Sequence, residues 1–165
     1  GSPRASSGAM KARRDIETDE KGVLDMSKIA IVYWSGTGNT EAMADLVAQG
    51  VRAAGGTAEL IQATDFDSSR LDDYDAFAFG CPAMGDEELE EMEFLPMYDE
   101  VEPHLPGRKV ALFGSYDWND GEWMELWEKR AEEAGVDVVD SVIAKDYPDD
   151  DASADCMRLG ALIAK

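Results

Sequence analysis

Residues that commonly build metal and nucleophile sites are scarce in this sequence, which has two cysteines and one histidine among 165 residues. Cys81 and Cys156 show neither C-x-x-C nor metal-ligand spacing. Cys81 ends an apolar segment and Cys156 falls on a helical apolar stripe, so we expect both to be small buried hydrophobes. Unpaired cysteines fit a reduced, cytoplasmic compartment. His104, between Pro103 and Leu105, is expected in a surface loop rather than in a catalytic role.

Long hydrophobic runs are also absent. The longest, at 29–34 and 110–113, have the length of a strand and fall far short of the roughly 20 residues needed to cross a bilayer. The N-terminus has no apolar segment of the kind found in secretory signals. We therefore expect no membrane insertion, and a chain of this length should form one domain with a single sizeable core.

Basic residues are few, because 15 Lys/Arg stand against 36 Asp/Glu and give a formal net charge of −21. The first 25 residues hold five of each sign, so the whole imbalance belongs to the remainder of the chain. Such a surface repels nucleic acid and anionic membranes and attracts basic partners. A generic acidic surface that favours solubility is an equal alternative, and composition does not separate the two.

The N-terminal segment differs in character from the rest of the chain. Residues 1–25 are polar, mixed in charge and without periodicity, and they open on a sequence typical of an expression scar. We expect a disordered arm there, with Met26 or Met10 as the natural start. The domain prediction is therefore an arm at 1–25 and one ligand-binding domain at 26–165.

Strand and helix signals alternate from residue 28 onward. Apolar, β-branched segments of strand length occur at 29–34, 57–61, 74–81, 109–115 and 136–144. Pro96 suits the first turn of a short helix that Pro103 closes. Longer helices are indicated by the apolar spacing of Met43, Leu46, Val47, Gly50 and Val51, of Trp123, Leu126, Trp127 and Ala134, and of Cys156, Leu159, Gly160 and Ile163.

This alternation predicts an α/β fold, a doubly wound parallel sheet with helices on both faces. Ligands of such sheets bind at the carboxyl ends of the strands. Unusual residues are therefore expected just after the first, third and fourth strands, and the sequence has them in all three places.

The first loop combines glycines with side chains that can donate hydrogen bonds. It lies at the start of a predicted helix, where backbone N–H groups favour an anion. It is neither a Walker A loop nor a dinucleotide fingerprint, because no Gly-Lys-Ser/Thr follows and Glu41 replaces the third glycine. Without Lys or Arg it suits one terminal phosphate monoester, and a turn with no ligand is the alternative. The loop consists of Ser35, Gly36, Thr37, Gly38, Asn39 and Thr40.

The second and third loops each contain a large apolar side chain that bears on function. Met84 follows Gly80, Cys81 and Pro82, and taken alone it would be interpreted as core filler. Trp118 lies among turn-forming residues at 114–121, which suggests a flat surface offered to a ring system.

Three segments together resemble the short-chain flavodoxins. Residues 31–41 are similar to the start of that family almost letter for letter, residues 80–90 resemble its second flavin loop, and 112–116 with 120–124 resemble the frame of its third. The similarity runs from about residue 28 to 165. It implies a flavodoxin-like sandwich with strand order 2-1-3-4-5, non-covalent FMN, and low-potential one-electron transfer rather than enzymatic turnover.

The resemblance also implies residue roles. Ser35, Thr37, Asn39 and Thr40 with the loop amides hold the phosphate, Met84 and Trp118 flank the flavin, Glu87 accepts from its N3–H, and the Gly85 carbonyl accepts from its reduced N5–H. Asp117 and Asn119 depart from the pattern, which usually has glycines there, so their contacts are the least secure. Outside the first loop, the implied contacts are Pro82, Ala83, Met84, Gly85, Asp86, Glu87, Ser115, Tyr116, Asp117, Trp118, Asn119 and Asp120.

A monomer that meets basic docking faces on a reductase and an acceptor is expected as the working form. Three alternatives remain: a flavin-dependent reductase of quinones, a phosphoacceptor receiver domain, and a domain that has lost its flavin. The receiver is disfavoured, because the ends of strands one and three lack the required acids. The expected docking face contains Asp86, Glu87, Glu88, Glu90, Glu91 and Glu93.

Overall fold

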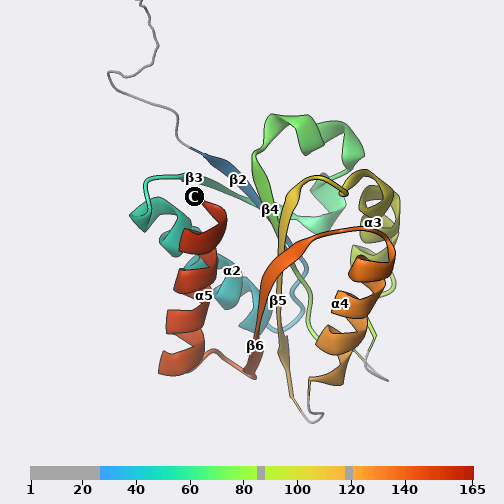
Figure 1. The fold of residues 1–165 in the computed structure, drawn as a ribbon. Helices are drawn as coiled ribbons and strands as arrows, with labels where there is room; N and C mark the ends of the chain where they lie inside the picture. Colours follow the sequence, from blue (N-terminus) through green and yellow to red (C-terminus); the bar gives the residue numbers. More distant parts are fainter. Residues whose placement is uncertain (1–26, 85–87, 118–120) are drawn as a thin grey trace, which may run out of the picture.

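The computed structural model describes residues 27–84, 88–117 and 121–165, arranged around a central sheet (Figure 1). The prediction for the arm at 1–25 falls outside these residues. The sheet has five parallel strands in the order β3-β2-β4-β5-β6. Counted from β2 as the first strand, this is 2-1-3-4-5, so the predicted fold class is confirmed. The strands are β2 (Lys28–Tyr33), β3 (Thr57–Gln62), β4 (Ala76–Gly80), β5 (Lys109–Tyr116) and β6 (Val138–Lys145).

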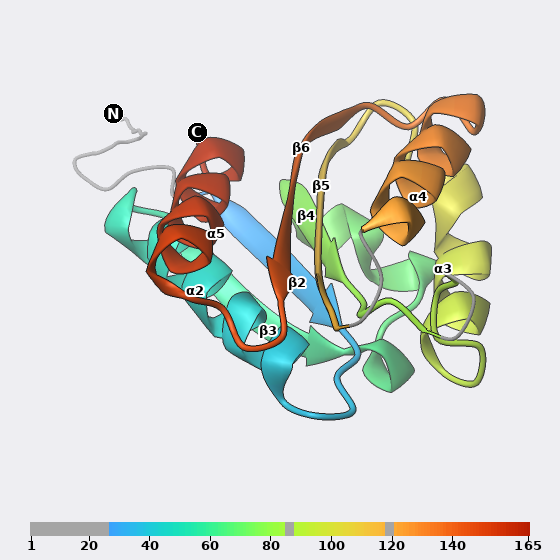
Figure 2. The same ribbon diagram turned by 90° about the horizontal axis from the view of Figure 1, so that it is seen from below.

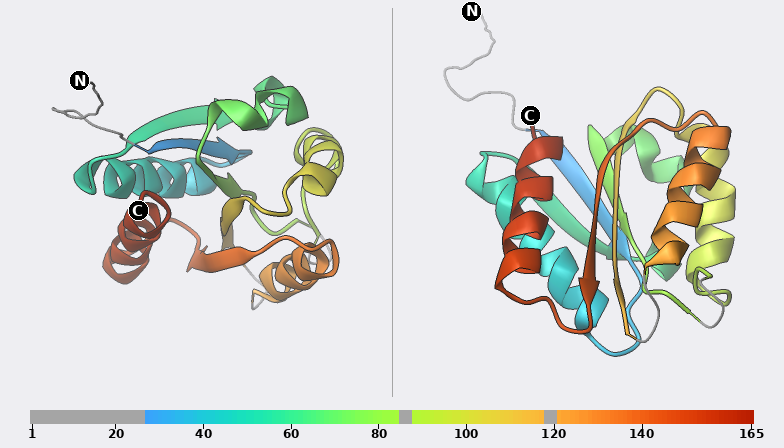
Figure 3. Two further views of the ribbon diagram at one scale, coloured as in Figure 1. Left: turned by 45° about the horizontal axis from the view of Figure 1, so that its top comes forward. Right: turned by 60° about the horizontal axis from the view of Figure 1, so that its bottom comes forward.

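Helices cover both faces of the sheet, as Figures 2 and 3 show. One pair lies against one face and the other pair against the opposite face, so the molecule has three layers. Short 3₁₀ turns at Ala63–Asp65, Ser68–Asp73 and Glu102–His104 join some of these elements. The first pair is α2 (Asn39–Ala53) with α5 (Asp150–Ile163), and the second is α3 (Phe94–Val101) with α4 (Glu122–Glu133).

The alternation of side chains along the strands divides the interior into two cores. Ile29 and Ile31 of β2 pack toward α2 and α5, whereas Ala30 and Val32 pack toward α3 and α4. On β4 the small Ala76 and Ala78 belong to the first core, and the aromatic side chains belong to the second. That second core contains a cluster of rings from the sheet and both helices: Phe77, Phe79, Phe94, Tyr98 and Trp127.

Glycine permits the close approach of α2 and α5. A Cβ on Gly50 would lie 1.9 Å from the Met157 carbonyl oxygen, and a Cβ on Gly160 would lie 2.0 Å from the Val47 carbonyl oxygen. Both glycines are buried, as their place on the predicted inner stripes implied.

Other side-chain predictions are mostly confirmed. Cys81 and Cys156 are both free and buried, and burial raises the pKa of each thiol. His104 is exposed. The assignment of Leu126 to the inner face of α4 was wrong, because half of its surface is exposed. The buried stripe of that helix runs instead through Trp123, Met124, Trp127 and Ala131.

Within the described part of the chain, no helix has both the length and the apolar character needed to cross a membrane.

A buried carboxylate organises the start of α3. Glu90 is 5% exposed, and its side chain accepts hydrogen bonds from the backbone N–H groups of Met92 (2.9 Å), Glu93 (2.7 Å) and Phe94 (2.8 Å). Burial opposes ionisation of this group, but the three donors outweigh it and the pKa of Glu90 is lowered. Glu90 thus satisfies amides that the first turn of a helix leaves without partners.

Glu90→Gln should lower the free energy of unfolding at neutral pH by about 1–2 kcal/mol, because a neutral amide accepts these hydrogen bonds less strongly. A depressed folded-state pKa contributes stability above the unfolded value of about 4.3, and this contribution is lost as pH falls through the folded value. Urea unfolding of the apoprotein between acidic and neutral pH measures the effect, with the exposed Glu91→Gln as control. A loss in the free energy of unfolding that is the same at every pH would contradict the role assigned to the ionised carboxylate of Glu90.

Candidate functional site

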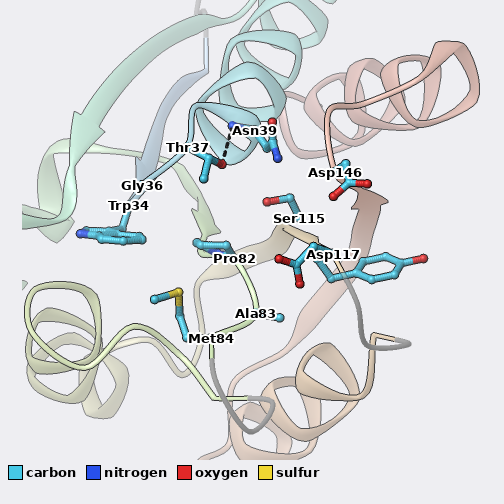
Figure 4. Close-up of a pocket in the computed structure, with 11 residues that line it drawn as sticks. Trp34, Gly36, Thr37, Asn39, Pro82, Ala83, Met84, Ser115, Asp117 and Asp146 are labelled. Carbon is cyan, nitrogen blue, oxygen red and sulfur yellow. Dashed lines mark hydrogen bonds between the residues drawn. The ribbon is translucent and has the colours of Figure 1, made fainter.

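A cavity of about 300 Å³ opens at the carboxyl ends of the strands, where the three predicted loops meet. Figure 4 shows that Trp34 and Met84 lie on one side of it, Thr37 and Asn39 at one end, and Asp146 on the opposite side from Trp34. The lining comes from the loops after β2, β4, β5 and β6. It consists of Trp34, Gly36, Thr37, Asn39, Pro82, Ala83, Met84, Ser115, Tyr116, Asp117 and Asp146.

The first loop turns sharply into α2. Gly38 has φ of 96° and stands immediately before the helix, a backbone conformation that residues with a Cβ rarely adopt. Ser35 Oγ accepts hydrogen bonds from the backbone N–H groups of Gly38 (3.1 Å) and Glu41 (3.2 Å). The serine hydroxyl therefore shapes the loop from within, while Thr37 and Asn39 line the cavity.

A buried pair of hydroxyls connects the first and third loops. Thr40 is 1% exposed, and its Oγ1 lies 2.8 Å from Ser115 Oγ at the end of β5. The sequence analysis assigned both residues to the ligand site. Ser115 lines the cavity. Thr40 does not line it and is connected to it by its hydrogen bond with Ser115.

The described hydrogen-bond donors that line the cavity are neutral groups, not cations. None of the described residues that line it is a lysine or an arginine, and two of them, Asp117 and Asp146, are acids. The hydroxyl of Thr37, the amide of Asn39 and the N-terminus of α2 lie together at one end of the cavity. A helix N-terminus with such donors can hold one phosphate group.

The second loop continues the hydrogen-bond pattern of the sheet before it turns back. The Ala83 N–H donates to the Ser115 carbonyl (2.9 Å), and Met84 and Glu88 exchange two backbone hydrogen bonds of 2.9 Å each. Met84 is half-buried and lines the cavity, so it belongs to neither core. Three predicted contacts within this turn, Gly85, Asp86 and Glu87, lie outside the described residues.

The predicted third loop begins within β5 in the structure: Ser115 and Tyr116 at the end of that strand line the cavity, and Asp117 directly after it does so too. Tyr116 packs against Trp123 of α4, with ring centroids 5.7 Å apart. The predicted flavin contacts Trp118, Asn119 and Asp120 lie outside the residues that the structure describes.

Two residues of the cavity were missed by sequence reasoning. Trp34 was interpreted only as the last residue of a buried strand, but β2 ends at Tyr33 and the indole of Trp34 is half-buried at the cavity. Asp146 follows β6, and among the described residues it alone combines a positive φ (56°) with a side chain. Its N–H donates to the Tyr116 carbonyl (2.7 Å). Both residues lie at the carboxyl end of a strand, and this position was the signal that could have placed them at the cavity.

The predicted acidic docking face needs one correction. Glu90 is buried and its carboxylate holds the start of α3, so it does not belong to an exposed surface. Glu88, Glu91 and Glu93 are exposed beside the second loop. Asp86 and Glu87 are outside the described residues.

Comparison with known proteins agrees with the fold and the three loops. The family model described as Flavodoxin matches residues 31–160. The flavodoxin of Megasphaera elsdenii is 44% identical over 83% of this chain and 98% of its own length, and that of Clostridium beijerinckii is 46% identical over 81% and 97%. The solution structure of two-electron reduced M. elsdenii flavodoxin superposes with a TM-score of 0.77 at 43% identity, covering 82% of this chain and 98% of that one. The chain therefore belongs to the flavodoxin family, and it is an FMN-binding electron-transfer protein rather than an enzyme.

Proposed function

We propose that this flavodoxin is a low-potential one-electron carrier that holds FMN in the cavity of its three loops and meets its redox partners through acidic groups around that cavity. The observation that carries the proposal is the cavity itself, with donors at one end and an apolar wall at one side. Two free, buried thiols support a reduced, cytoplasmic setting. The exposed large apolar side chains are scattered over several elements, which supports a monomer.

The donor set of the first loop fits a single terminal phosphate. Thr37 and Asn39 offer a hydroxyl and an amide into the cavity, and the loop amides at the start of α2 add oriented dipoles. Gly36 has no side chain to fill the space beside Trp34, where a Cβ would lie 3.0 Å from the indole. The residues present therefore suit FMN. Ser35 and Thr40 support this site by holding the loop in shape.

The remaining walls suit a flat ring system. Trp34, Pro82, Ala83 and Met84 supply apolar contact, and the cavity lies at the sheet edge, open to a partner. Bound FMN supplies the one-electron chemistry. The protein binds it, limits its contact with water and sets the electrostatic field around it.

That field supports a low potential. Asp117 and Asp146 line the cavity, and none of its described lining residues carries a positive charge. Added electrons place negative charge on the ligand, and carboxylates nearby oppose this. The charge of −21 for the whole chain acts in the same direction at longer range.

Replacing Thr37 and Asn39 together by alanine should weaken FMN binding far more than riboflavin binding. Hydrogen bonds to a charged phosphate contribute about 1.5–3 kcal/mol each, so we expect a loss of about 100-fold or more for FMN. Riboflavin, which lacks the phosphate, should lose only a few-fold. Titration of the apoprotein by flavin fluorescence measures both, with the exposed Gln49→Ala at the far end of α2 as control. An equal loss for both ligands would overturn the phosphate assignment.

Asp146→Asn should raise the potential at which bound FMN accepts its second electron. Asparagine tolerates the positive φ at this position, so the substitution removes charge without straining the backbone. A partly screened carboxylate shifts a one-electron potential by on the order of 20–40 mV. Potentiometric titration at low salt measures the shift. The control is Asp137→Asn, which removes the same charge just before β6, at the other end of that strand. Equal shifts in both variants would refute a local effect.

Electron transfer to a basic acceptor should slow as salt rises and the Debye length falls from about 30 to 10 Å. Replacing Glu88 and Glu91 by glutamine should lower the rate at low salt and flatten this dependence. The matched control is Glu132→Gln with Glu133→Gln, which removes the same charge at the end of α4 that lies far from the cavity. Stopped-flow kinetics with each pair tests the proposed face. Equal effects of the two pairs would leave only the net charge as the cause.

A further inference from the structure

The indole of Trp34 bridges two loops that the cavity brings together. Trp34 Nε1 donates a hydrogen bond of 2.7 Å to Glu93 Oε1, 59 positions away in the sequence. Its ring also covers Gly36, since a Cβ on that glycine would lie 3.0 Å from Trp34 Cη2. The same ring lines the cavity on the side of Met84 (Figure 4). One side chain therefore contacts the first loop, the end of the second loop and the ligand space.

The acceptor of this hydrogen bond is itself held in place. Glu93 stands immediately before α3, and its backbone N–H donates to the buried carboxylate of Glu90 at 2.7 Å. Glu90 is joined in turn to the end of β4, because its N–H donates to Cys81 Sγ at 3.3 Å. The Glu93 side chain is exposed, but its backbone is fixed to the core of the molecule.

We propose that Trp34 is a positioning residue for FMN and that Glu93 orients its indole. The inference rests on the proposed placement of FMN in this cavity. The hydrogen bond sets the ring in one orientation, and the ring then defines how close the first loop stands to the Met84 side of the cavity. Glu93 acts through Trp34, without contact with the ligand.

A free indole at this position would have other orientations. Trp34 is half-buried, and it also lines a second, smaller hollow together with Tyr33, Gln62 and Thr64. Without the Glu93 acceptor the ring has space to turn into, in the ligand cavity and in this hollow. Restricting it before the ligand arrives lowers the ordering cost of binding, and removing the restriction weakens affinity.

The test compares Trp34→Phe, Glu93→Ala, Glu93→Gln and the double variant Trp34→Phe with Glu93→Ala. The first two should each weaken FMN binding to the apoprotein by about 3- to 10-fold, and the double variant should be no weaker than the worse single one. Glu93→Gln should restore affinity, because its amide oxygen accepts the same hydrogen bond. Glu91→Ala, which removes the same charge two residues earlier, is the control. Visible circular dichroism of bound flavin should change in Glu93→Ala and return in Glu93→Gln.

Three results would overturn the inference. The first is that Glu93→Ala binds FMN as tightly as Glu91→Ala does. The second is that the losses of FMN affinity in the double variant are additive. The third is that Glu93→Gln fails to restore FMN affinity. Urea unfolding of each apoprotein separates a general loss of stability from a positioning effect, because the latter weakens FMN binding in a variant that is still fully folded under the conditions of the titration. Failure of the unaltered protein to bind FMN would reject the proposed function itself, and is read independently of the variants.

Discussion

The burial of the central strands on both faces is the constraint on which the rest of this molecule depends. β2 and β4 are covered by α2 and α5 on one side and by α3 and α4 on the other, so neither face of these central strands is open to a ligand. Parallel strands bring all their carboxyl ends to one edge. The loops after β2, β4, β5 and β6 therefore meet at a single cavity, and the chemistry of the protein is concentrated there.

Side-chain hydrogen bonds within and between the loops keep that cavity in shape. The Ser35 hydroxyl closes the first loop, the Thr40–Ser115 pair joins that loop to β5, and Glu90 fixes the start of α3. The cavity combines neutral donors, from Thr37 and Asn39, with the acidic side chains of Asp117 and Asp146. This arrangement suits a carrier whose ligand becomes more negative as it is reduced.

Sequence patterns predicted the architecture well, because the spacing of apolar residues and the positions of turn-forming residues are local properties of the chain. Five apolar segments separated by helical stripes and glycine-rich turns led to the correct sheet order once the family resemblance was added. Strand boundaries were less accurate, as at Trp34, because a buried run does not reveal where the last ladder hydrogen bond lies. Leu126 was misplaced for a similar reason: the spacing of Trp123 and Trp127 leaves open which side of the stripe is buried.

The sequence by itself determined the fold class and the excess of acid, and it predicted the first loop as an anion site, because these follow from spacing and composition. The tertiary structure decided which of several similar groups has which task. Glu90 and Glu93 belong to one acidic run, yet the carboxylate of Glu90 is buried and accepts backbone hydrogen bonds at the start of α3, whereas that of Glu93 accepts a hydrogen bond from Trp34. Asp146 enters the cavity only because β6 lies beside β5. Contacts between residues tens of positions apart depend on packing, and no local pattern encodes them.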